Sequence, residues 1–102
     1  MTKAERWQAF QESQGELKLR PKVHSFAQAM EAKLQFNDHR GGWDDADINV
    51  IIRLLLGEVT ELLQAIQQEG PEEVLYEAAD VANYALIAAD IMRGLTGENG
   101  RH

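Results

Sequence analysis

The chain has 102 residues, of which 44% are hydrophobic, and its formal net charge is −7. This size and composition fit a single globular domain over residues 1–102 and exclude a disordered chain. The acidic balance argues against direct binding to nucleic acids or anionic membranes, and the absence of cysteine excludes disulfides and thiolate metal ligands.

Apolar residues recur at helical spacing along most of the chain, and no segment alternates as a strand. The first predicted helix begins after Thr2, which forms a capping-box pattern with Glu5, and it ends near Gly15. The second begins at Pro21, a residue suited to the first helical position. A loop follows over Phe36–Asp47, where paired glycines and clustered aspartates interrupt the helical pattern.

Two longer helices follow this loop. The pattern predicts one helix from Asp47 to Glu69 and another from Pro71 to near Arg93, before Gly94, with a break at Gly70-Pro71. The predicted fold is therefore all-α, with a long antiparallel helix pair against which the two earlier helices pack.

Four carboxylates fall on the core-facing sides of these two long helices. The third helix has an apolar face made of Ile48, Ile51, Ile52, Leu55, Val59, Leu62 and Ile66. Glu58 lies inside this apolar arc, and Glu61 lies about 60° further out, one turn along. Glu77 and Asp80 stand in the core-facing stripe of the fourth helix, which continues through Val81, Tyr84, Ile87, Ala88 and Ile91.

Buried carboxylates need a partner, because leaving them unpaired costs several kcal/mol. The two long helices offer few cations, chiefly Arg53 and, near the end of the fourth helix, Arg93. A divalent metal ion is then the natural counter-charge, and oxygen ligands suit Mg²⁺ or Mn²⁺. Facing helices of a bundle commonly build metal sites in this way.

The order Glu58-x-x-Glu61, fifteen residues, Glu77-x-x-Asp80 resembles the motif of the all-α NTP pyrophosphohydrolases, the MazG and dUTPase-like superfamily. The resemblance covers Lys33 to Met92. The segment from Lys33 to Trp43 is similar to that of short phage-type MazG-like proteins, in particular the MazZ-type branch that acts on dGTP and dATP.

The resemblance implies a four-helix MazG-like fold assembled as an oligomeric bundle. It also implies hydrolysis between the α- and β-phosphates, with two or three Mg²⁺ (or Mn²⁺) ions per site. The metal ligands would be Glu58, Glu61, Glu77 and Asp80. Glu61, at the outer edge of its helix face, is the candidate to orient or deprotonate the attacking water.

Five further residues are candidates for substrate binding, each with a structural alternative. Lys33 could reach a phosphate or lie along the surface as a snorkelling side chain, and Asn37 could contact base or sugar or cap the loop. Trp43 could stack on a base or anchor the core. In the resembled family, polar residues at the positions of Asn83 and Tyr84 touch phosphate or metal-bound water, although a buried Tyr84 hydroxyl could have a structural partner instead.

The fourth helix is apolar on nearly every side, so three other helices of one chain cannot cover it. We expect a homo-oligomer, and the resemblance implies a dimer of dimers. The N-terminus is too polar for a signal peptide, and the apolar stretch Ile48–Leu56 is too short to span a bilayer. The expected location is the cytoplasm, which would be the host cytoplasm for a phage-encoded chain.

Two alternatives stay open. The chain could be a pyrophosphohydrolase of the same superfamily that acts on another substrate, such as dCTP, dUTP or phosphoribosyl-ATP. It could also be a non-catalytic helical interaction module whose acidic stripe forms salt bridges with a partner. If the metal site is correct, Glu61→Gln and Asp80→Asn should lose activity yet gain stability without metal, because clustered like charges repel.

Overall fold

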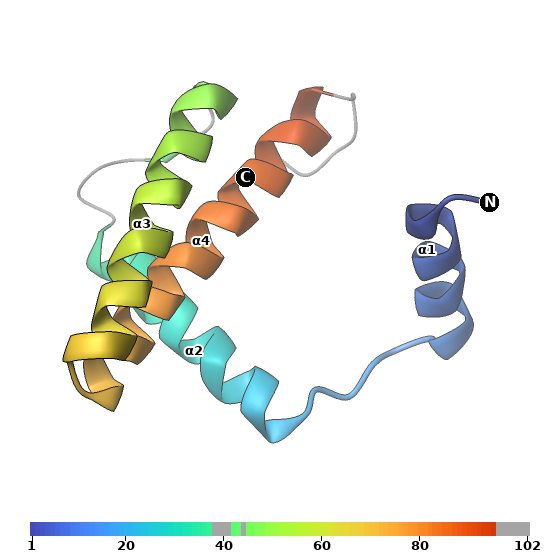
Figure 1. Cartoon of the computed structure of the whole chain (residues 1–102). Coiled ribbons are helices and arrows are strands. Elements are labelled where there is room, and N and C mark those ends of the chain that lie inside the picture. The colour runs from blue at the N-terminus through green and yellow to red at the C-terminus, as the bar shows by residue number, and fades with distance from the viewer. Residues whose placement is uncertain (38–41, 44, 96–102) are drawn as a thin grey trace.

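The computed structural model describes residues 1–37, 42–43 and 45–95, and this part of the chain is all-helical, without strands. The four helices are α1 (Lys3–Gln14), α2 (Pro21–Phe36), α3 (Ile48–Gln68) and α4 (Pro71–Leu95) (Figure 1). The all-α class and the number of helices predicted from the sequence are confirmed.

Local sequence signals explain where the helices begin and end. The Thr2 N–H donates to Glu5 Oε1 at 2.8 Å, and the Glu5 N–H donates to Thr2 Oγ1 at 3.1 Å, which completes the predicted capping box. Gly15 ends α1 with a φ of 64°, a backbone conformation that residues with a Cβ atom rarely adopt. Asp47 caps α3 by accepting a hydrogen bond from the Asn49 N–H at 2.8 Å.

Helices α3 and α4 lie side by side, and α2 crosses α4 (Figure 1). The core is a small cluster in which Ile51 of α3 is buried against Ile87 and Ile91 of α4. Trp43, from the segment between α2 and α3, packs on this cluster. This arrangement places Glu58, Glu77 and Asp80 on the α3–α4 interface, next to the core.

Helix α1 stands apart from the other helices (Figure 1). The prediction that both early helices pack on the long pair is therefore right for α2 and wrong for α1. None of its residues is buried, and its large apolar side chains Trp7 and Phe10 are 64% and 60% exposed. Two such residues in twelve do not make the wide apolar stripe that docks a helix on a core.

Helix α4 runs to Leu95, two residues beyond the predicted end at Arg93. Its path continues through Gly94, because a glycine weakens a helix by only about 1 kcal/mol relative to alanine and does not break it. None of the described helices combines the length and apolar character needed to cross a membrane.

Candidate metal centre

Three of the four predicted metal ligands lie together between α3 and α4. One carboxylate oxygen each from Glu58, Glu77 and Asp80 forms a group whose members are all within 4.8 Å of one another. Glu58 comes from α3, while Glu77 and Asp80 are neighbours on one face of α4. Three carboxylate oxygens at this spacing are the donor set that a hard divalent cation such as Mg²⁺ or Mn²⁺ prefers.

Glu58 is the acid of this group whose surroundings raise its pKa to about 7. Its Oε2 atom is buried and has no hydrogen-bond partner among the described residues. Burial, a hydrogen bond with Glu61 and the negative charges of Asp80, Glu61 and Glu77 raise the pKa of Glu58 to about 7. Burial, followed by the charges of Glu61 and Asp80, also raises the pKa of Glu77. A bound cation would relieve both effects, so the residues present fit a divalent metal.

Glu61 differs from the other three acids because its side chain is exposed and lies outside the group within 4.8 Å. It is nevertheless close enough to raise the pKa of Glu58 and of Glu77. Glu61 thus lies at the solvent side of the acidic group, as its position around the helix predicted.

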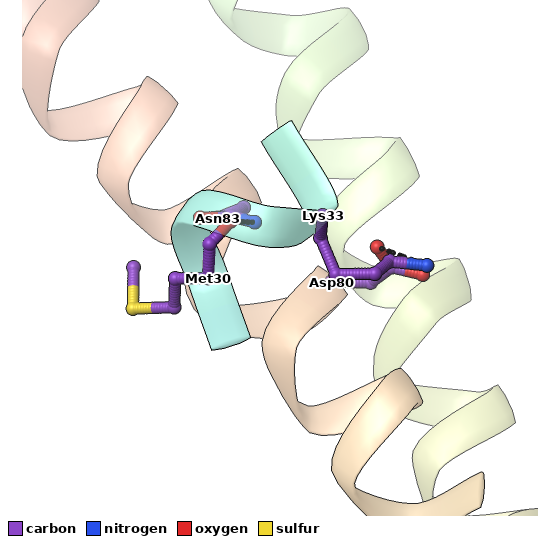
Figure 2. A network of polar contacts seen from close by, with 4 residues as sticks. All are labelled: Met30, Lys33, Asp80 and Asn83. Carbon is purple, nitrogen blue, oxygen red and sulfur yellow. Dashed lines mark hydrogen bonds and ion pairs between the residues drawn. The ribbon is translucent and has the colours of Figure 1, made fainter. Parts of the chain in front are cut away.

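Lys33 of α2 places a positive charge beside the acidic group, which the sequences of α3 and α4 alone do not indicate. Its side chain is buried, with Nζ 3.3 Å from Asp80 Oδ1 (Figure 2). The same Nζ lies 2.9 Å from the centroid of the Tyr76 ring. The interpretation of Lys33 as a surface lysine is wrong. Arg53 and Arg93 are also not the main cations available to the acids, since α2 crosses α4 and brings Lys33 onto the acidic face. The position of Lys33 between Met30 and Leu34, in the apolar pattern of α2, was the available signal.

A cavity of about 240 Å³ adjoins the acidic group, slightly smaller than the usual range for ligand pockets. Six predicted site residues line it: Asn37, Trp43, Glu58, Asp80, Asn83 and Tyr84. Lys33, Glu61 and Glu77 are not part of its wall. Apolar residues that were not singled out as site residues, among them Leu34, Ile51 and Ile87, complete the lining.

The wall of this cavity changes from acidic to apolar along the helix pair. On α4, Asp80 is followed one turn later by Asn83 and two turns later by Ile87, which belongs to the core cluster. On α3, which runs in the opposite direction, Glu58 lies near Asp80 and Ile51 packs near Ile87. The cavity therefore has a charged end and an apolar end.

Trp43 takes part in both the core and the cavity. The indole Nε1 donates a hydrogen bond to Asp90 Oδ2 at 2.9 Å, and the ring packs against the cluster of Ile51, Ile87 and Ile91. The same residue lines the apolar end of the cavity. Core anchoring is thus observed, and a contact between Trp43 and a base stays a prediction. Residues 38–41 of the segment from Lys33 to Trp43 lie outside the described part.

Asn83 is the most buried polar residue in the cavity wall, with 5% exposure. Its Nδ2 donates to the Met30 carbonyl oxygen at 3.0 Å, which joins α4 to α2 (Figure 2). Its Oδ1 atom is buried and has no hydrogen-bond partner among the described residues. The amide is therefore held in place on one side and unpaired on the other.

Neither protein-family models nor curated proteins nor solved structures match this chain.

Proposed function

We propose that this chain is a divalent-metal-dependent nucleoside triphosphate diphosphohydrolase of the MazG-like type, within the all-α NTP pyrophosphohydrolase superfamily. The proposed substrate is a purine deoxynucleoside triphosphate, dGTP or dATP, and the products are the monophosphate and pyrophosphate. The observation that carries this proposal is one cavity with grouped carboxylates at one end and an aromatic and apolar wall at the other. The preference for a purine is supported by the resemblance of the segment from Lys33 to Trp43.

In this proposal Glu58, Glu77 and Asp80 hold the metal, with Glu61 at the edge of the group. Two or three Mg²⁺ or Mn²⁺ ions held there would supply positive charge for the phosphates and would activate water for attack. Glu61 takes the proton from the attacking water, because its exposed carboxylate lies at the solvent side of the group. Hydrolysis of this kind needs positioning and charge compensation rather than a covalent nucleophile.

Lys33 and Trp43 would act on opposite parts of the nucleotide. The Lys33 ammonium has three N–H donors, so it can pair with Asp80 and still bind a phosphate oxygen. Trp43 would contact the base, since its ring lines the apolar end of the cavity. Asn37 also lines the cavity and is placed to contact the base or the sugar.

The proposal includes a homo-oligomer, with the dimer of dimers of the resembled superfamily as the expected assembly. It is supported by large apolar side chains that α4 leaves exposed: Leu75, Tyr76, Leu86 and Met92. The MazG-like packing of the helices belongs to the same proposal.

The proposal is tested by measuring pyrophosphate release from dGTP, dATP, dCTP, dUTP and the ribonucleotides with Mg²⁺ or Mn²⁺. We expect turnover of the purine deoxynucleotides with equal amounts of monophosphate and pyrophosphate. Glu61→Gln should lower kcat by about 10²–10⁴, the usual contribution of a general base. Glu72→Gln, at an exposed acid in the first turn of α4, is the matched control and should keep wild-type turnover.

The same panel separates the alternatives. A preference for dCTP or dUTP would mean that the chain is a pyrophosphohydrolase of the same superfamily with a pyrimidine substrate. Absence of pyrophosphate release from every nucleotide would reject the enzyme and favour a non-catalytic helical interaction module.

A further inference from the structure

The side-chain amide of Asn83 has a defined orientation and an unused acceptor. Asn83 Nδ2 donates to the Met30 carbonyl oxygen at 3.0 Å (Figure 2), which leaves the carbonyl oxygen Oδ1 as the acceptor atom of the same amide. Asn83 is only 5% exposed, and Oδ1 has no partner among the described residues. A buried acceptor without a donor is costly, so we expect a bound molecule to supply the donor.

The position of Asn83 in the cavity indicates which part of a nucleotide lies against it. An α-helix rises about 1.5 Å per residue, so Asn83 stands about 4.5 Å beyond Asp80, and Ile87 stands about 6 Å further. With the phosphates at the acidic group and the base against Ile87 and Trp43, the sugar falls at the level of Asn83.

The chemistry of the nucleotide narrows the choice of donor. Ionised phosphate oxygens are acceptors and cannot satisfy Oδ1, whereas a hydroxyl group can donate to it. The sugar of a deoxynucleoside triphosphate has a single hydroxyl, at the 3′ position. We propose that Asn83 Oδ1 accepts a hydrogen bond from the 3′-hydroxyl of the substrate, which makes Asn83 a specificity-determining residue for the sugar. This inference depends on the proposed function.

The test compares kcat/KM for the best deoxynucleotide with its 3′-fluoro-3′-deoxy and 2′,3′-dideoxy analogues. The fluoro analogue keeps the size of the 3′ substituent but cannot donate. Wild-type protein should lose about tenfold to hundredfold in kcat/KM on either analogue, because Oδ1 is then left unpaired. The Asn83→Ala variant should have the same kcat/KM for all three nucleotides within about twofold, because it lacks the acceptor that distinguishes them. Asn49→Ala, at an exposed asparagine of α3, should keep the wild-type discrimination.

Equal kcat/KM of the wild-type protein for the natural and fluoro nucleotides would overturn the inference and leave the proposed function standing. A discrimination that persists unchanged in Asn83→Ala would also overturn it, since another group would then contact the hydroxyl. Asn83→Ala also removes the contact with Met30, so the fold of this variant is checked by circular dichroism. If the variant does not fold, the comparison of the three nucleotides with the wild-type protein alone decides the inference. No turnover of any nucleotide would reject the proposed function and this inference together.

Discussion

The Glu58 carboxyl titrates near neutrality, because burial, Glu61 and the neighbouring acids raise its pKa from 4.5 to about 7. Between these two pH values the unfolded chain releases a proton that the folded chain keeps. This group therefore favours the folded state at low pH, and its contribution to stability falls as the pH rises from about 4.5 to about 7. Above about pH 7 the destabilisation caused by the ionised Glu58 carboxylate no longer changes with pH.

We therefore expect Glu58→Gln to stabilise the metal-free protein at pH 8 by on the order of 1 kcal/mol and to have little effect at pH 4.5. Urea unfolding of both proteins across this range measures the difference and cancels the other titrating groups. Saturating Mn²⁺ should stabilise the wild type much more than the variant, since the cation takes the place of the proton. A stability difference that does not vary with pH would contradict the assignment.

The ion pair between Lys33 and Asp80 reverses one expectation drawn from the sequence. Counting acids alone, Asp80→Asn should relieve repulsion and stabilise the metal-free chain. The structure places Lys33 Nζ 3.3 Å from Asp80, with side-chain exposures of 10% and 16%. Asp80→Asn would leave this buried ammonium without its anion, so we expect a loss of about 3 kcal/mol in the free energy of unfolding.

A double-mutant cycle checks this prediction. Lys33→Met combined with Asp80→Asn should recover much of the stability that Asp80→Asn loses, because neither charge then remains buried. Arg53→Met, at an exposed cation of α3, is the matched control and should change stability by less than about 0.5 kcal/mol. An Asp80→Asn variant that is more stable than the wild type would show that repulsion among the acids outweighs the ion pair.

These residues also show how far a candidate site can be predicted from a sequence. Helical spacing was enough to place Glu58, Glu77 and Asp80 on one interface, because phase around a helix depends only on residue number. The partner of Asp80 could not be found in this way. Lys33 lies on another helix, and where that helix crosses α4 is decided by tertiary packing.

At the level of the helices, helix boundaries are predicted from the sequence more accurately than the packing of helix faces. The bounds of α3 differ from the prediction by a single residue at each end, because Asp47 and the Gly70-Pro71 break are local signals. The apolar face of α3, by contrast, divides into two in the structure. Ile51 and Ala65 are buried toward α4, whereas a second row is 43–61% exposed and forms what we call the outer stripe: Ile52, Leu56, Val59, Leu63 and Ile66.

The outer stripe is the surface on which we expect α3 to associate with a second copy. Its residues lie within about 80° of one another around the helix and continue over four turns. An exposed apolar row of this length is typical of an interaction site. Leu63→Glu should therefore dissociate the oligomer, measured as a smaller mass by sedimentation.

Gln64→Glu is the matched control, because it adds the same charge at the next residue, which is exposed but points away from the stripe. The control should keep the wild-type mass. An unchanged mass for Leu63→Glu would exclude the outer stripe from the interface.

For the whole molecule, the accessible surface is larger than a chain of this mass should have. The chain exposes 8092 Å², whereas a compact monomer of 11.5 kDa exposes about 5,800 Å². The radius of gyration, 15.5 Å, likewise exceeds the value of about 13 Å for a compact domain of this length. The excess, part of which belongs to the isolated α1, is similar to the area that obligate interfaces bury.

A monomer with so small a core should be weakly stable, so folding should be coupled to association. Only five hydrophobic residues of the described chain are buried: Ile51, Ala65, Ala79, Ile87 and Ile91. If folded chains associate and unfolded chains do not, the melting temperature rises with protein concentration. For a dimer we expect about 3–6 °C per tenfold increase. Circular dichroism from micromolar to hundred-micromolar protein measures this shift, and Leu63→Glu should melt lower without concentration dependence. A wild-type melting temperature that stays constant over this range would mean that the helices are stable in a single chain, and the surface excess would then need no partner.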